Sequence, residues 1–301
     1  MPKKHTNLVP FSSLEEATGA LPFTMTNDYL FKVVLQENNH VLCELIRSLL
    51  HFPKEYEITA EIQNPIILGR SVENKEFILD IKVIVNRSKI LNLEMQVKDE
   101  LNWQNRSISY LSRSFDQTNH GQKYNEICPV IHIGFLDFTL FKNSPRFYST
   151  YKLMETETHQ IYSDNFDLRV LDLTKMDLAT ETDKKWQLDY WAALFKAKTW
   201  EELKAMANTN VFMDEACQTI FKMTADEWVQ KCCYDREDYL ASIASYQDLL
   251  KEKEDVITEG IHGLISTCME FNVPREDIIH RIMTSFSLSR EDAERYLMEY
   301  K

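Results

Sequence analysis

An alternation of apolar and polar side chains over residues 79–98 constrains this chain more than any other part of its sequence. Two alternating runs flank residues 86–88, and a three-residue loop there pairs Val85 with Lys89 across an antiparallel hairpin. In that register one face of the hairpin is wholly apolar and consists of Leu79, Ile81, Val83, Val85, Leu91, Leu93, Met95 and Val97. A shift of one residue would turn this whole set toward solvent, so we expect this face to be core and the register to be fixed.

The other face of the hairpin carries the polar residues Asp80, Lys82, Asn92, Glu94, Gln96 and Lys98, together with Ile78, Ile84 and Ile90. The register places Asp80 opposite Glu94, and directly opposed like charges destabilise a pair of strands. A cation between them would remove that cost, since two carboxylates and a backbone carbonyl form a hard-oxygen site suited to Mg²⁺ or Mn²⁺. Mg²⁺ held there can activate a bound water against a phosphate ester, and Gln96 could position that water. Alternatively, the polar stripe is the solvated face of an antiparallel sheet.

A helix predicted over residues 103–118 follows the hairpin and could cover its polar face. Its basic, aromatic and amide residues fall close to one helical face: Trp103, Arg106, Tyr110, Arg113 and Gln117. Arginines interleaved with aromatic rings suit contacts to the phosphates and bases of DNA, and Lys123 lies just beyond this helix. The alternative is an ordinary amphipathic helix with snorkelling arginines.

The periodicity of the first half predicts a mixed α/β fold. Helical spacing covers residues 28–35 and 40–50, with Thr26 as the N-cap of the first helix. Period-two or apolar runs predict strands over residues 58–68, 77–85, 90–97, 130–138, 147–153 and 166–173. With the helix at 103–118, the order is α-β-β-β-α-β, a mixed sheet flanked by helices.

The second half is predicted to be helical from residue 183 onward. Helices are expected over residues 185–196, 199–207, 213–223, 225–259 with breaks, and 260–271. Residues 274–282 (PREDIIHRI) recur as residues 289–297 (SREDAERYL) and predict two short stacked helices. We therefore expect a domain over residues 1–180 and an acidic helical region over residues 181–301. The short repeat at 274–297 is either a helical interaction module or a cap on the domain.

The charge of the chain is unevenly distributed. Residues 1–150 hold 16 Lys and Arg against 17 Asp and Glu, a net charge of −1, whereas residues 151–301 hold 18 against 30, a net charge of −12. Because an acidic surface repels a phosphate backbone, we expect nucleic-acid chemistry in the first half and a partner-binding, solubilising or regulatory role in the second.

Cysteine usage and hydropathy predict a soluble cytoplasmic protein. The six cysteines form no CxxC pair and are expected to be buried, reduced thiols. No apolar run approaches the roughly 20 residues that a membrane-spanning helix needs, and Met1 to Phe23 does not resemble a signal peptide.

Five segments taken together resemble the PD-(D/E)XK nuclease superfamily, and within it the Rpn family of recombination-promoting, transposase-like nucleases. They are TNDYLFK (26–32), LDIKV (79–83), LNLEMQ (91–96), RSISYLSRSF (106–115) and GQKYNEICPVIHIGFLDF (121–138). The acidic helical second half is also similar to the tail of that family. The resemblance covers most of the chain and implies a bacterial enzyme of DNA recombination or transposition that cleaves DNA with Mg²⁺ or Mn²⁺.

The resemblance also implies roles for individual residues. Asp80 would bridge the metal, Glu94 would be the acidic member of the second motif, and Asp28 would be a further acidic residue near the metal. Asp28 has an alternative role as a carboxylate favoured by the helix dipole. Gln96 stands where most of the superfamily has Lys, although the Rpn-like branch commonly has Gln. Since Lys82 lies diagonally across from Glu94, we hypothesise that it supplies the missing positive charge.

A second interpretation is a protein that keeps the nuclease fold without strong catalysis and binds a protein partner through its acidic helical half. Gln96 and the overall charge favour it. If the chain cuts both strands of DNA, it needs two metal sites, so a homodimer is also expected.

Overall fold

The computed structural model describes residues 9–64, 66, 81–116, 123 and 126–300. The chain divides into two compact units, Met1–Arg236 and Glu237–Lys301. The boundary expected after residue 180 falls inside the first unit, between the 3-10 helix η2 (Leu173–Leu178) and α4 (Glu181–Lys185). The helices that follow α4 therefore belong to the same compact body as the sheet.

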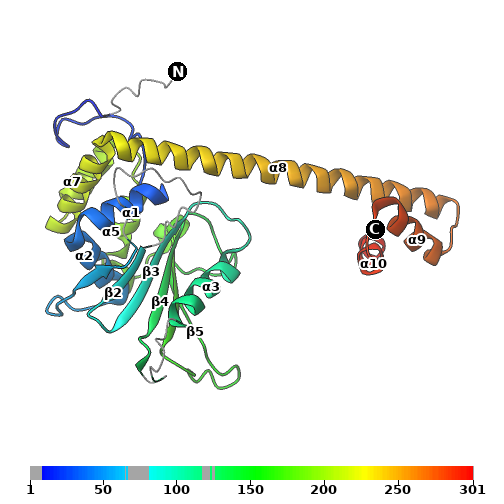
Figure 1. Cartoon of the computed structure of the whole chain (residues 1–301), viewed down its shortest axis with the longest axis horizontal. Helices are drawn as coiled ribbons and strands as arrows, with labels where there is room; N and C mark the ends of the chain where they lie inside the picture. Colours follow the sequence, from blue (N-terminus) through cyan, green and yellow to red (C-terminus); the bar gives the residue numbers. More distant parts are fainter. Residues whose placement is uncertain (1–8, 65, 67–80, 117–122, 124–125, 301) are drawn as a thin grey trace. The chain divides into compact units, whose positions relative to one another are not determined.

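A mixed sheet of six strands forms the centre of the first unit within the described residues (Figure 1). The strands are β1 (Ala60–Ile62), β2 (Ile81–Val85), β3 (Lys89–Gln96), β4 (Val130–Leu136), β5 (Tyr148–Lys152) and β6 (Phe166–Asp172). Their order is β1-β2-β3-β4-β6-β5, in which β3 with β4 and β4 with β6 are parallel and the other pairs are antiparallel. With helices α1 (Asp28–Glu37), α2 (Asn39–Leu50) and α3 (Trp103–Phe115), this is the predicted αβββαβ fold.

The hairpin of β2 and β3 has the register predicted from its alternating residues. Val85 pairs with Lys89, and the pairing continues to Ile81 opposite Leu93. Asn86 and Arg87 adopt left-handed backbone angles, with φ of 49° and 51°, which closes the three-residue loop. The register is therefore confirmed over the described pairs, whereas Leu79 and Asp80 lie outside the described residues.

The two faces of the sheet are covered by different helices (Figure 1). Leu91, Leu93 and Met95 of β3 are buried in a large apolar core that includes residues of α1 and α2. Burial of each such side chain contributes about 1.5–3 kcal/mol, which fixes this face of the hairpin inward. Helix α3 lies against the opposite face, so the polar side of β3 is also covered.

The first helix is capped by Asn27 and not, as predicted, by Thr26. The Asn27 side chain accepts hydrogen bonds from the backbone N–H groups of Tyr29 and Leu30, each at 3.2 Å. The hydroxyl of Thr26 instead pairs with that of Thr24 at 2.6 Å. Asn27 also donates to the carbonyl of Cys233 at 3.2 Å, and this long-range bond selects it over its neighbour.

Three helices that follow α4 complete the first unit of the described chain together with the start of α8 (Glu227–Glu270). They are α5 (Leu188–Lys196), α6 (Trp200–Ala207) and α7 (Val211–Ala225). Val229, Cys232 and Cys233 of α8 are buried in the same apolar core as α1. All six cysteines are free thiols, and five of them are buried as predicted.

The second unit has a small apolar core of its own. The end of α8 packs with α9 (Arg275–Phe286) and α10 (Arg290–Glu299), which are the two short helices predicted from the repeat. The breaks predicted between residues 225 and 271 are wrong, because α8 is continuous from Glu227 to Glu270. A Cβ on Gly260 would lie 3.1 Å from the ring of Phe286, so the absence of a side chain at this position makes room for Phe286 of α9. A glycine inside a helix costs about 1 kcal/mol relative to alanine, and this cost does not end α8.

None of the helices in the described part of the chain has both the length and the apolar character that a membrane crossing requires.

Candidate active site

Glu94 is the central residue of the polar face of β3. It is only 3% exposed, on a strand whose neighbours on the other face are core residues. Its Oε1 accepts a hydrogen bond of 2.7 Å from Nε of Arg106, and its Oε2 lies 3.5 Å from Nε2 of His132. A charged carboxylate is thus buried between the sheet and α3 with a guanidinium beside it.

Helix α3 is fixed on the sheet by the side chains that it buries, which are Trp103, Ser107, Leu111 and Ser114. Trp103 fits against Gly134 of β4 so closely that a Cβ there would lie 2.1 Å from its ring. At the other end of the helix, the Asn92 amide donates to the Ser114 hydroxyl at 2.7 Å. These two contacts set the position of Arg106 over Glu94.

A row of rings lies next to the Glu94–Arg106 pair. The guanidinium of Arg106 is 5.5 Å from the centre of the Tyr110 ring. Tyr110 stacks on His132, with ring centres 5.9 Å apart and an angle of 15° between the planes. The ring centre of Trp103 lies 5.5 Å from that of His132. The aromatic residues of α3 therefore enclose the histidine and limit the access of water to Glu94.

His132 was not anticipated from the sequence. It is fully buried on β4, where it pairs with Asn92 in the β3–β4 register. Burial lowers the pKa of His132 to about 3, and the positive charge of Arg106 lowers it further, so the imidazole is neutral. Its signal in the sequence was a single polar residue inside the apolar run 130–136, which predicted burial but not a neighbour.

Gln96 and Lys82 flank Glu94 on the hairpin. The Gln96 side chain is partly exposed at the end of β3, and its Nε2 donates to the carbonyl of Lys98 at 3.2 Å. Lys82 is half-buried and pairs directly with Asn92, two residues from Glu94, which is the diagonal relation that the hairpin predicts. Asp80, the predicted partner of Glu94, lies outside the described residues.

Asp28 makes a different set of contacts from Glu94. Both of its oxygens accept from the guanidinium of Arg236 at the start of α8: Nε lies 2.9 Å from each oxygen, and Nη2 lies 2.6 Å from Oδ2. Burial raises the pKa of Asp28, and the paired Arg236 opposes that shift. These contacts favour a structural ion pair between α1 and α8, while the metal role expected for Asp28 stays a prediction.

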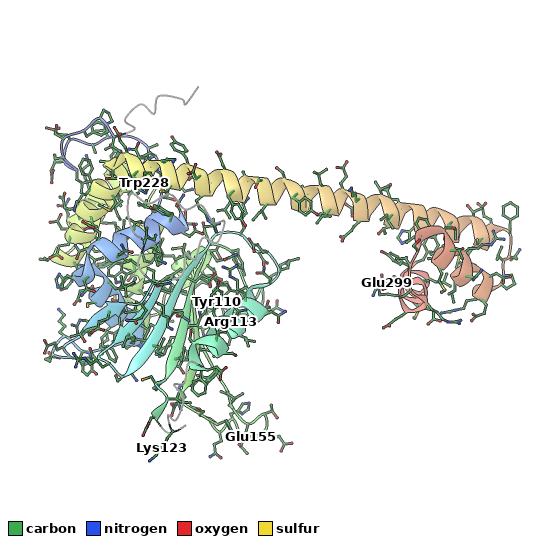
Figure 2. All side chains as sticks on the ribbon, in the orientation of Figure 1. Tyr110, Arg113, Lys123, Glu155, Trp228 and Glu299 are labelled. Carbon is green, nitrogen blue, oxygen red and sulfur yellow. The ribbon has the colours of Figure 1, made fainter. Side chains whose placement is uncertain are left out.

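The residues predicted to contact DNA are partly brought together. Tyr110 and Arg113 lie on α3, with Arg113 exposed, and Figure 2 shows them near each other at the sheet. Lys123 is exposed and lies apart from both in the same view. Gln117 is outside the described residues. Arg106 differs from the prediction in that its guanidinium contacts Glu94.

The described residues include Glu94 and Asp28 of the predicted metal ligands, whereas Asp80 lies outside them. Among them, no three His, Cys, Asp or Glu side chains gather closely enough to hold a metal ion. Glu94 nevertheless fits a divalent cation, because its carboxylate is held in a fixed orientation and needs a positive charge beside it. That charge comes from Arg106 in this structure. A cation would need further oxygen ligands, of which Asp80 is the predicted one.

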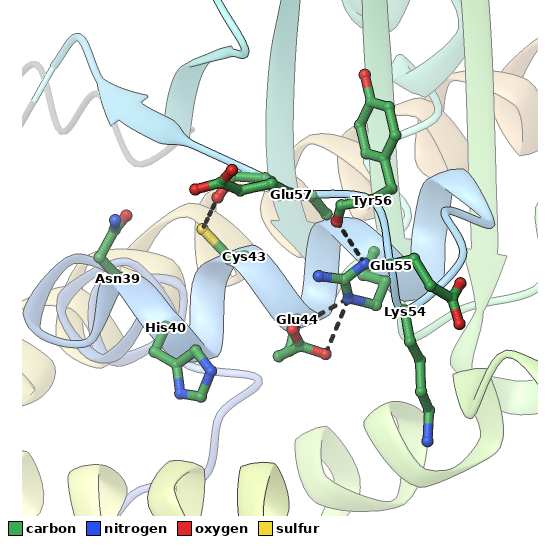
Figure 3. A pocket seen from close by; sticks show the side chains of 10 residues that line it. Asn39, His40, Cys43, Glu44, Lys54, Glu55, Tyr56 and Glu57 are labelled. Atoms are coloured by element: carbon green, nitrogen blue, oxygen red, sulfur yellow. Dashed lines mark hydrogen bonds and ion pairs between the residues drawn. The ribbon is translucent and has the colours of Figure 1, made fainter.

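A pocket of about 510 Å³ lies elsewhere in the first unit, against α2 (Figure 3). Its arginine, Arg47, donates to Glu44 and to the carbonyls of Pro53 and Tyr56. None of the residues that line it is Glu94 or one of the residues in contact around it, which are Arg106, Tyr110 and His132. Because its arginine already binds a neighbouring glutamate and two backbone carbonyls, this pocket is not our candidate active site.

Comparison with known proteins identifies one family. The model of the PD-(D/E)XK nuclease family transposases matches residues 25–248, which is 224 of the 301 residues. The match includes α1 to α7 and ends within α8, so that α9 and α10 lie beyond it. No curated protein and no solved structure matches the chain.

Proposed function

Because the chain belongs to the PD-(D/E)XK nuclease family transposases, we propose that it is a metal-dependent DNA endonuclease acting in recombination or transposition. The observation that carries this proposal is the buried carboxylate of Glu94, which is held under a helix that also carries Arg106, Tyr110 and Arg113. A buried carboxylate is costly unless it is paired, as Glu94 is with Arg106, and buried carboxylates of this kind cluster at functional sites.

The roles that we propose are supported by the described positions of Glu94 and Gln96 and, for Asp80, by the predicted hairpin register and the family resemblance. Glu94 and Asp80 would hold Mg²⁺ or Mn²⁺, which when bound polarises a phosphoryl oxygen and lowers the pKa of a coordinated water. Gln96, at the partly exposed end of β3, would orient the attacking water through its amide. Water adds to phosphorus, the bond to the leaving oxygen breaks, and the products are a phosphate monoester and a hydroxyl.

The remaining polar residues would bind the DNA. Arg113 and Tyr110 offer a cation and a ring on the same helix, suited to a phosphate and a base, and Lys123 would contact the backbone further along. Lys82 would supply the positive charge that Gln96 lacks. Lys82→Ala should therefore reduce the rate of cleavage, and cleavage at the parental rate would refute this role.

Cleavage of supercoiled plasmid tests the function. Wild-type protein with Mg²⁺ or Mn²⁺ should give nicked or linear DNA, while Glu94→Gln and Asp80→Asn should not. Glu55→Gln, which makes the same change at an exposed residue, is the matched control and should cut as wild type does. Failure of the wild type with both metals would refute the proposal.

A second candidate function is a partner-binding protein that retains the nuclease fold. The observation that favours it is the second unit, whose α9 and α10 share a separate apolar core and lie beyond the family match. Thermal melting at Mn²⁺ concentrations high enough to saturate a weak site separates the two functions, since a cation that binds the folded state must raise the melting temperature. A rise with Mn²⁺ that is lost in Glu94→Gln supports the nuclease, and its absence supports the binding protein.

Two further properties belong to the proposal. Cutting both strands requires two Glu94 centres, so we expect a homodimer, and a monomer in light scattering with and without DNA would contradict it. We also expect a cytoplasmic location, which the six free thiols support.

A further inference from the structure

The contact between Arg106 and Glu94 places two proposed functions in conflict. Arg106 was expected to bind DNA and Glu94 to bind the metal, yet Nε of Arg106 lies 2.7 Å from Oε1 of Glu94. The side chain of Glu94 is 4% exposed, and that of Arg106 is 38% exposed. The guanidinium of Arg106 therefore binds the buried carboxylate, while part of the arginine side chain is exposed to solvent.

The pair is the expected state of this site without a cation. A buried carboxylate needs a countercharge, and Arg106 supplies it through a charge-assisted hydrogen bond. A divalent cation bound to the carboxylate of Glu94 would lie close to the guanidinium of Arg106, whose Nε is 2.7 Å from Oε1. Two positive charges at one oxygen repel each other, so metal and guanidinium compete for Glu94.

Arg106 has an alternative partner if DNA is present. Its guanidinium has further N–H donors beyond Nε, and among the described residues these make no hydrogen bond. It lies one turn before Tyr110 and two turns before the exposed Arg113 on α3. A DNA phosphate along this helix would offer the guanidinium an anion at the solvent side of the site.

We propose that Arg106 exchanges Glu94 for a DNA phosphate, and that metal binding and DNA binding therefore strengthen each other. This inference rests on the proposed nuclease function. Without DNA, Arg106 neutralises Glu94 and weakens metal binding. With DNA, the arginine moves to the phosphate, and Oε1 becomes available to the cation. Cleavage competence is thereby restricted to the complex with the substrate, and linkage requires the two affinities to change by the same factor.

Titration of Mn²⁺, followed by electron paramagnetic resonance, tests the exchange on the full chain. The wild type is titrated with and without a short phosphorothioate duplex, which resists cleavage. We expect DNA to tighten Mn²⁺ binding by about 5-fold or more, within the usual range of coupling between sites. Fluorescence anisotropy of the labelled duplex should show the same factor when Mn²⁺ is added. This reciprocal pair of measurements needs no variant.

Arg106→Gln then assigns the coupling to the arginine. It should bind Mn²⁺ more tightly than the wild type in the absence of DNA, and DNA should no longer tighten that binding. Arg113→Gln is the matched control: it should weaken DNA binding and leave the Mn²⁺ affinity without DNA unchanged. Circular dichroism checks that each variant is folded, and if Arg106→Gln is not, Arg106→Met, which keeps much of the length of the side chain without its charge, takes its place with the same expected results.

The outcomes separate the inference from the function on which it rests. Mn²⁺ binding that Glu94→Gln abolishes but DNA does not change would overturn the exchange and leave the nuclease proposal intact. Coupling that persists in Arg106→Gln would also overturn it. Absence of Mn²⁺ binding to the wild type, with and without DNA, would refute both.

Discussion

Removal of the Arg236 side chain tests how strongly the ion pair with Asp28 stabilises the first unit. The guanidinium contacts both oxygens of Asp28 at 2.6–2.9 Å, and the two side chains are 14% and 10% exposed. Breaking a buried pair from one side costs about 3–5 kcal/mol, whereas an exposed pair is worth about 0–1 kcal/mol. Since both side chains keep slight exposure, we expect about 3 kcal/mol for Arg236→Met, which retains the length of the side chain.

Urea unfolding followed by circular dichroism measures this cost. The midpoint for Arg236→Met should fall at an unchanged slope, because the fold itself is retained. Adding Asp28→Asn should recover part of the loss, since the buried charge left without a partner is removed. A loss below about 1 kcal/mol, the value of a surface pair, would refute the reasoning.

The loss of stability in Arg236→Met should depend on pH. Burial raises the pKa of Asp28 and Arg236 opposes that rise, so removing Arg236 raises the folded-state pKa further. A group with a raised folded pKa stabilises below its unfolded pKa, and this stability is lost as pH rises through the folded pKa. The deficit of Arg236→Met should therefore shrink as pH falls from neutral toward about 4, the ordinary pKa of Asp. A deficit independent of pH would indicate lost packing instead.

Three other predictions concern residues of the first unit. Gly134→Ala should lower stability by about 1–3 kcal/mol in urea unfolding, because its Cβ would overlap the ring of Trp103. Because buried His132 has a pKa of about 3, its imidazole takes up a proton only on unfolding as pH falls from 6.5 to 5, and the metal-free protein should lose about 2 kcal/mol of stability over that range. His132→Gln should lose less stability than the wild type over the same range, as urea unfolding can show. Burial raises the pKa of the Cys217 thiol to about 12, so iodoacetamide should label Cys128 in the folded protein and leave Cys217 unmodified, as mass spectrometry can show.

The register of the β2–β3 hairpin could be predicted because the alternation of apolar and polar residues fixes which face of each strand is buried. A slip of one residue would have turned Leu91 and Leu93 to the polar face of the hairpin, so local pattern and core burial agree. The family could be predicted for a similar reason, since its motifs are local segments in a fixed order. The αβββαβ order and both short terminal helices also follow from local periodicity.

The contacts of the charged residues could not be predicted because they depend on tertiary packing. Glu94 and Arg106 were both identified as candidate site residues. Their pairing depends on the position of α3, which the packing of Trp103 against Gly134 sets. Asp28 and Arg236 are separated by 208 positions, and no local pattern joins them. The separate helices predicted over residues 225–259 and 260–271 are one continuous α8, and the packing of Phe286 explains the glycine at position 260.

The number of Mn²⁺ ions bound per chain tests the central claim, that Glu94 and Asp80 share one cation, most directly. Titration followed by electron paramagnetic resonance, with the phosphorothioate duplex present, should give one site per wild-type chain. Glu94→Gln and Asp80→Asn should each lose it, while the exposed control Glu55→Gln keeps it. Binding that survives in both variants, or that is absent from the wild type, would contradict the account.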